Sequence, residues 1–185
     1  MGLYDSLLIG AHQTKRKLFI SFYHKDDEYY RNRFETLFGH LFINKSVKIG
    51  DITTDVSTEY IKRLIQLSYL SDTSVLVVLI GAKTYCRKHV DWEISAALSK
   101  KVGGYTGLVG LILPSHPDYG KDTYNSENIP SRLAENLSSG YAKLYDWSEN
   151  AESIKTRIDI AFNAKNSQSH LICNASPQFQ KNRCK

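Results

Sequence analysis

The stretch LFISFYHKDD, residues 18–27, changes character halfway along. Its first half is a near-continuous run of β-forming residues, which is typical of a strand covered on both faces in a parallel sheet. Its second half brings a histidine and two aspartates to the end of that strand. Because open parallel sheets bind ligands outside the carboxyl ends of their strands, this stretch predicts a site at the tip of the first strand.

Helical and strand patterns alternate along the rest of the chain. The runs SVLVVLI at 74–80 and GLVGLIL at 107–113 are typical of buried strands. A short, weaker strand is expected at 46–52 and a last strand at 142–147. Between them, apolar residues recur at the spacing of one helical face. The expected helices cover residues 30–42, 57–70, 90–98, 130–137 and 154–162.

This alternation predicts an α/β protein built from right-handed βαβ units. Five strands favour an open, mostly parallel, flavodoxin-like sheet of order 2-1-3-4-5 with helices on both faces. We expect a single domain at residues 17–164, preceded by an N-terminal extension at 1–16 and followed by a polar C-terminal tail at 165–185.

Composition narrows the function classes. The formal net charge is +5, but the basic residues are spread along the chain, so a nucleic-acid surface is not expected. The cysteines at 86, 173 and 184 are too scattered for a disulfide framework or a zinc site, and we interpret Cys86 as a passive thiol in a reducing compartment. No stretch approaches the roughly 20 apolar residues of a membrane span, so we expect a cytosolic protein without membrane contact.

A second polar stretch follows the most apolar strand. TYCRKHVDWEI, residues 84–94, leads from the carboxyl end of that strand into a helix and places Glu93 in the first turns. Its carboxylate could face a pocket, or it could stabilise the helix N-terminus through the macrodipole. Asp26 or Asp27 could likewise merely cap the first helix. Phosphate-loop, dinucleotide and HExxH motifs do not occur.

Two of these stretches resemble a known family. KLFISFYHKDD at 17–27 resembles the first box of TIR domains, and RKHVDWEI at 87–94 resembles their later W-C-x-x-E box, with Glu93 at the glutamate. His89 stands where that box usually has tryptophan, and Val90 stands at the cysteine. The likeness covers residues 17–164 and is greatest to the ThsB-type TIR proteins of bacterial Thoeris antiphage systems.

The resemblance implies an enzyme that cleaves NAD between nicotinamide and ribose and produces a cyclic ADP-ribose-type signal. By position, Glu93 would be the catalytic carboxylate, with NAD as substrate and no cofactor or metal. Aromatic residues near it would stack on the base or pack in the core. The substrate-binding residues implied are Ser21, Phe22, Tyr23, His24, Asp26 and Trp92.

The family also implies partners. Through its product the protein would activate a cyclic-nucleotide-responsive effector protein, and a phage-derived trigger and homo-oligomerisation are further expectations. Two alternatives remain open. One is a non-catalytic TIR-like adaptor that acts by self-association. The other is a receiver-type phosphoacceptor that uses Asp26, Asp27 and an acid at Asp51 or Asp55 around magnesium.

Overall fold

The computed structural model describes residues 15–45, 70–100 and 104–184. Its centre is a five-stranded sheet of order β2-β1-β3-β4-β5, in which every neighbouring pair is parallel. This confirms the predicted flavodoxin-like order. The strands are β1 (Lys17–Ser21), β2 (Ile43–Asn44), β3 (Val75–Ile80), β4 (Gly107–Ile112) and β5 (Lys143–Asp146).

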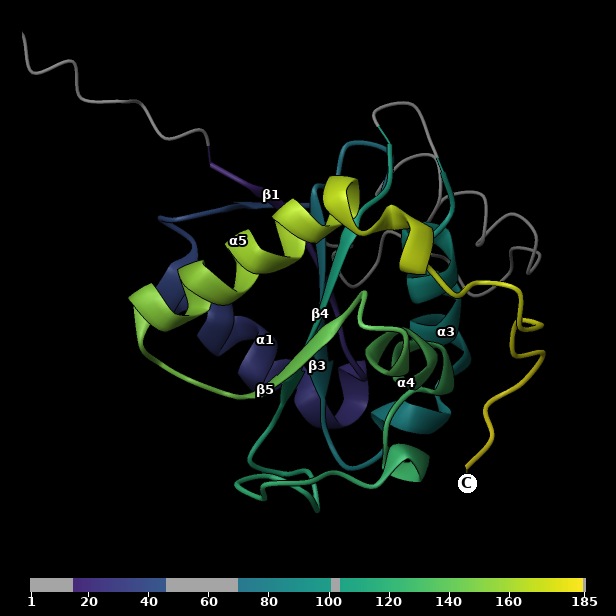
Figure 1. Ribbon diagram of the computed structural model, residues 1–185. Helices are drawn as coiled ribbons and strands as arrows, with labels where there is room; N and C mark the ends of the chain where they lie inside the picture. The colour runs from purple at the N-terminus through teal and green to yellow at the C-terminus, as the bar shows by residue number, and fades with distance from the viewer. Residues whose placement is uncertain (1–14, 46–69, 101–103, 185) are drawn as a thin grey trace, which may run out of the picture.

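Helices cover both faces of this sheet, with α1 and α5 on one face and α3 and α4 on the other (Figure 1). The α-helices are α1 (His24–Phe38), α3 (Lys88–Ala97), α4 (Ser131–Ser138) and α5 (Ala151–Ser167). Short 3-10 turns are η2 (Thr84–Cys86), η3 (Ser126–Asn128) and η4 (Ser169–Leu171). None of these helices is both long and apolar enough to cross a lipid bilayer, as far as the described residues go.

The position of β3 in the centre of the sheet explains why its sequence is apolar without interruption. Successive side chains of a strand point to opposite faces, and in β3 both faces are covered. Val75, Val77 and Leu79 pack with α1 and α5, whereas Leu76, Val78 and Ile80 pack with α3 and α4. All six residues of β3 are fully buried.

The first helix is shorter than its apolar spacing suggested. It ends at Phe38 and is followed by a turn, so Leu41 and Phe42 are not helical. Phe42 nevertheless joins the core below α1, because the turn after Gly39 returns it to the same face. The strand expected at 46–52 lies outside the described residues, as does most of the helix expected at 57–70.

The residues that we expected to form a polar tail lie against the domain. Helix α5 continues to Ser167, and residues 172–184, the C-terminal segment, run along α3 and α4. The buried Arg132 of α4 donates to Asp91 of α3 (3.0 Å), to Asn174 (2.9 Å) and to the Ser176 carbonyl (2.8 Å). One guanidinium therefore ties two helices and this segment together.

The end of the C-terminal segment reaches the start of α3. The Cys184 and Cys86 side chains form a disulfide, with their Cα atoms 5.6 Å apart, and the Arg183 amide donates to the Cys86 carbonyl. Our expectation of a passive Cys86 thiol is wrong, because a pairing across 98 residues is invisible to local spacing. Because two of the three cysteines form a disulfide, the spacing of the cysteines no longer supports a reducing compartment. Cys173 is free.

Candidate active site

The structure brings Glu93 to the tip of the first strand. Ser21, the last residue of β1, is 1% exposed, and its hydroxyl donates to Glu93 Oε2 at 2.5 Å. Glu93 lies in the second turn of α3, which packs on the face of the sheet made by Phe19 and the even-numbered residues of β3. The two stretches that resemble TIR-domain boxes, residues 17–27 and 87–94, thus meet through a direct side-chain contact.

The surroundings of Glu93 disfavour its charged form. Glu93 is half-buried as a whole residue, and its carboxyl group lies within the protein next to Ser21. This burial raises the pKa of Glu93 to about 8, while the hydrogen bond from Ser21 acts in the opposite direction. A carboxyl group with such a pKa can change its protonation state near neutral pH, as a catalytic acid or base must.

The loop after β1 supplies three further residues at this end of the sheet. Phe22 is buried in the core, and the His24 ring lies against it at 4.1 Å between centroids. His24 and Asp26 are exposed in the first turn of α1. Burial, and after it the charges of Lys88 and His24, lower the pKa of His89, whose ring lies against Trp92 at 5.0 Å between centroids.

A contact between Tyr23 and Arg87 joins this loop to the start of α3. The Arg87 guanidinium lies over the Tyr23 ring at 3.7 Å, and its Nε donates to the Lys83 carbonyl. Arg87 was not predicted as a site residue, because an arginine before a helix carries no local signal. Tyr23 is half-buried beneath it, so one face of its ring is already occupied.

Trp92, which the resemblance places among the substrate-binding residues, is packed inside the protein. Trp92 is 1% exposed, and its indole N–H donates to the Phe179 carbonyl at 2.8 Å. It therefore contacts the C-terminal segment, whereas Glu93 contacts β1. Side chains of adjacent residues in a helix point about 100° apart, so Trp92 and Glu93 contact different parts of the protein although they are neighbours in the sequence.

A buried polar contact that we did not predict connects α1 to the loop after β3. Thr84, which is fully buried, donates to Asp27 Oδ2 at 3.0 Å and accepts from the Gly81 amide at 2.9 Å. A Cβ at Gly81 would lie 2.0 Å from Asp27 Oδ1, so only glycine permits this approach. Burial raises the pKa of Asp27. Asp27 thus joins α1, which begins at His24, to the loop after β3.

Two pockets in the described part of the chain lie away from Glu93. One is lined by residues from before β1, after α1 and on α5, and another lies under α1; neither includes Ser21 or Glu93. We base the candidate active site on the buried carboxyl and its partners. No group of three or more potential metal ligands occurs in residues 15–45, 70–100 and 104–184.

Comparison with known proteins places the chain in a family. The family model of the Thoeris protein ThsB, TIR-like domain, matches residues 19–118. This chain belongs to that family. The match includes Ser21, the loop of Tyr23 and His24, and Glu93. No curated protein matches.

Among solved structures, this ThsB-family domain is similar to the TIR domains of the activated Roq1 resistosome, which directly recognises the pathogen effector XopQ. The similarity covers 82% of this chain and 84% of that chain, at 10% sequence identity and a TM-score of 0.41. A likeness of this size adds nothing about function. The candidate active site of this ThsB-family domain therefore rests on its own geometry, above all on the Ser21–Glu93 contact.

Proposed function

We propose that this ThsB-family protein cleaves NAD at the bond between nicotinamide and ribose, with Glu93 as the catalytic carboxylate. The observation that supports the proposal most directly is the buried Glu93 carboxyl, hydrogen-bonded to Ser21 at the carboxyl end of β1. This is the position at which open parallel sheets bind their ligands. The product we propose is a cyclic ADP-ribose-type signal that activates an antiphage effector protein.

The chemistry needs only one carboxylate. Most glycosidases pair two, because one must protonate a departing oxygen. Nicotinamide is a cationic ring in NAD, and it leaves neutral when the C1′–N bond breaks and both electrons pass to its nitrogen. Positive charge then develops on the ribose. A fixed carboxylate in a water-poor site stabilises that charge, and Glu93 meets this requirement once it is ionised.

The raised pKa of Glu93 fits both halves of such a reaction. The cationic nicotinamide ring of bound NAD favours the ionised carboxylate, because an opposite charge within a few ångströms lowers the pKa of an acid. After the bond breaks, an attacking hydroxyl forms a bond to C1′ and loses its proton. A carboxylate with a pKa of about 8 accepts that proton more readily than an ordinary glutamate does.

Cyclisation differs from hydrolysis only in the attacking group. Water gives linear ADP-ribose, whereas a second group of the same molecule gives a cyclic product. Exclusion of water from C1′ favours the second course. The cover over the Glu93 carboxyl is consistent with a site of that kind.

The test is product analysis with a matched pair of variants. Wild type, Glu93→Gln and Glu127→Gln are incubated with NAD, in buffer and with extract of phage-infected cells, and nicotinamide, linear and cyclic products are measured by mass spectrometry. Glu127 is an exposed glutamate on η3 and serves as the control. We expect nicotinamide release by wild type and Glu127→Gln and at least a hundredfold loss in Glu93→Gln, since a group active in the transition state is removed.

Three results would change the conclusion. A folded Glu93→Gln variant that keeps most of the turnover removes Glu93 from the mechanism. Linear ADP-ribose as the sole product leaves a glycohydrolase without a cyclase step. If wild type shows no turnover under either condition but self-associates with concentration, the non-catalytic adaptor is the correct assignment.

A further inference from the structure

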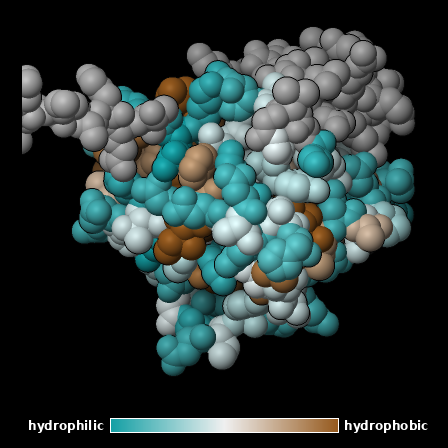
Figure 2. Space-filling view, turned by 45° about the horizontal axis from the view of Figure 1, so that its top comes forward, coloured by the Kyte–Doolittle hydropathy of each residue, from teal (hydrophilic) through white to brown (hydrophobic). Residues whose placement is uncertain are grey.

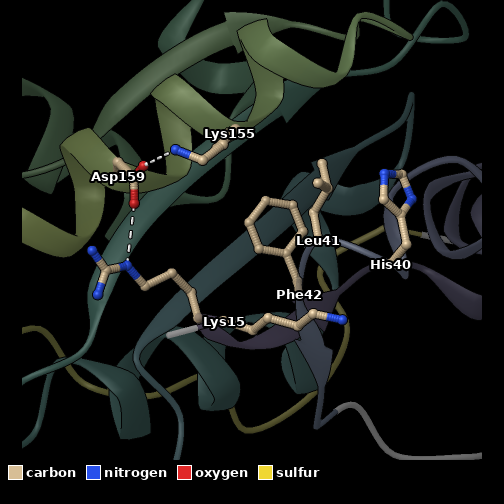
Figure 3. Close-up of a pocket in the computed structure, with 7 residues that line it drawn as sticks. Lys15, His40, Leu41, Phe42, Lys155 and Asp159 are labelled. Carbon is tan, nitrogen blue, oxygen red and sulfur yellow. Dashed lines mark hydrogen bonds and ion pairs between the residues drawn. The ribbon is translucent and has the colours of Figure 1, made fainter. Parts of the chain in front are cut away.

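A pocket of about 160 Å³ opens at the end of the sheet away from Glu93. Its walls come from the residues before β1, from the turn between α1 and β2, and from α5 (Figure 3). Lys15 and Arg16 lie at the amino end of β1, whereas Ser21, the contact of Glu93, lies at its carboxyl end. At about 3.3 Å per residue, the strand separates the two sites by roughly 15 Å. The pocket is lined by Lys15, Arg16, His40, Leu41, Phe42, Lys155 and Asp159.

Positive charge predominates in this pocket, because Lys15, Arg16 and Lys155 line it together with a single carboxylate, Asp159. Asp159 accepts from Arg16 Nε at 3.1 Å and from Lys155 Nζ at 3.0 Å, so its two oxygens are each occupied by a different cation. Lys15 extends along the other side of the pocket, away from Asp159 (Figure 3). One carboxylate therefore holds two cations in place and leaves the pocket with a net positive charge.

Neighbouring residues add to this excess. The Arg16 guanidinium lies over the Phe162 ring at 3.6 Å, and Lys165 Nζ lies 4.6 Å from the same ring. Burial and, after it, the positive charge of Arg16 lower the pKa of Lys165. Lys165 thus adds a further positive charge next to Arg16, which lines the pocket.

The shape of the pocket limits what can bind. Its volume is well below the roughly 300 to 1,000 Å³ of sites for drug-sized ligands, so it suits a small group. Leu41 and the largely buried Phe42 form an apolar wall beside the cations (Figure 3). Figure 2 turns the top of Figure 1 toward the viewer, and on the face that it shows hydrophilic side chains surround small apolar patches.

From these observations we propose that the pocket binds the phosphoryl group of a small phosphorylated molecule, at a second site independent of Glu93. A phosphate monoester carries about −1.5 to −2 charge near pH 7, which matches several cations better than a carboxylate does. Guanidinium and ammonium groups are the usual partners of phosphate oxygens. The apolar wall receives the first carbons of the ester.

The experiment measures binding to the full chain by titration calorimetry at low ionic strength. The probes are inorganic phosphate, phenyl phosphate, benzoate and phenol, with wild type and the variants Lys15→Gln and Lys155→Gln. Two control variants are used. Lys143→Gln changes an exposed lysine on β5, and Arg87→Gln removes the cation beside the candidate active site.

We expect saturable binding of phenyl phosphate, weaker binding of inorganic phosphate and no binding of phenol. Lys15→Gln and Lys155→Gln should each weaken phosphate affinity about tenfold, and added salt should weaken it further, since each lost contact is a charge-assisted one. Lys143→Gln and Arg87→Gln should bind as wild type does.

Other outcomes overturn the proposal. Equal affinity in Lys15→Gln, Lys155→Gln and wild type places the anion elsewhere, and loss of binding in Arg87→Gln places it at the other end of the sheet. Benzoate that binds as tightly as phenyl phosphate refutes the choice of a phosphoryl group. Because the readout is binding and not NAD turnover, the result does not depend on the proposed enzymatic function.

Discussion

Replacing Ser21 by alanine tests the link between the two halves of the candidate active site. The Ser21 hydroxyl donates to Glu93 at 2.5 Å and stabilises the ionised carboxylate, against the burial that raises the pKa to about 8. A hydrogen bond to a charged group contributes about 1.5–3 kcal/mol. At about 1.36 kcal/mol per pKa unit, its loss raises the pKa of Glu93 by roughly one to two further units.

This shift has a measurable consequence for the rate. With a pKa of about 8, about one-tenth of the Glu93 carboxyls are ionised at pH 7 in the free wild-type protein. In Ser21→Ala the ionised fraction falls roughly ten- to hundredfold at that pH and recovers in alkaline solution. The dependence of kcat/KM on pH reports the ionisation of the free enzyme, so its rising limb should move from about 8 to between about 9 and 10.

The assay is nicotinamide release from pH 6 to pH 10, combined with carbon NMR titration of the Glu93 carboxyl. Ser138→Ala, an exposed serine at the end of α4, is the control. The reasoning is refuted if Ser21→Ala titrates as wild type does, or if its rate is lowered equally at every pH. The NMR titration applies even if the protein has no NAD turnover.

Three stability predictions follow from other contacts. Glu93→Gln should stabilise the fold by up to about 4 kcal/mol at pH 8 and little at pH 4. The pKa of Glu93 rises on folding from 4.5 to about 8, so stability is lost as pH rises between these values, at about 1.36 kcal/mol per pH unit; urea unfolding at both pH values measures this. Arg132→Ala should cost about 3–5 kcal/mol, since Asp91 is left buried without its counter-ion, and limited proteolysis should cut residues 172–184 faster. Gly107→Ala should cost about 1–3 kcal/mol in urea unfolding, because the new Cβ would lie 2.1 Å from the Ala161 carbonyl oxygen of α5.

An exposed ion pair provides the control for Arg132. Arg33 and Glu149 meet at 2.7 Å with side chains 39% and 50% exposed, so Arg33→Ala should cost no more than about 1 kcal/mol. Equal costs for Arg132→Ala and Arg33→Ala would contradict the role given to the buried pair. A Glu93→Gln variant that is no more stable than wild type at pH 8 would contradict the burial of that carboxyl. A Gly107→Ala variant as stable as wild type would contradict the close packing of α5 against β4 at this position.

The sequence alone determined the architecture of this protein. The uninterrupted apolar residues of β3 and β4 predict strands with two covered faces, and the helical spacing of Ile154, Ile158 and Ala161 predicts the face that α5 buries. These signals are local, because strand and helix periodicities are carried by neighbouring residues. The position of Glu93 after the central strand was also predictable, since the carboxyl ends of parallel strands share one edge of the sheet.

Only the tertiary structure decided which polar groups meet. Ser21 and Glu93 are separated by 72 residues, Asp27 and Thr84 by 57, and Cys86 and Cys184 by 98. No sequence periodicity relates such positions, because these polar groups become neighbours only when segments distant in the sequence pack together in the folded chain. For the same reason, the basic pocket of Lys15, Arg16 and Lys155 and the raised pKa of Glu93 are properties of the folded chain: burial and proximity create them, and neither exists before the sheet is assembled.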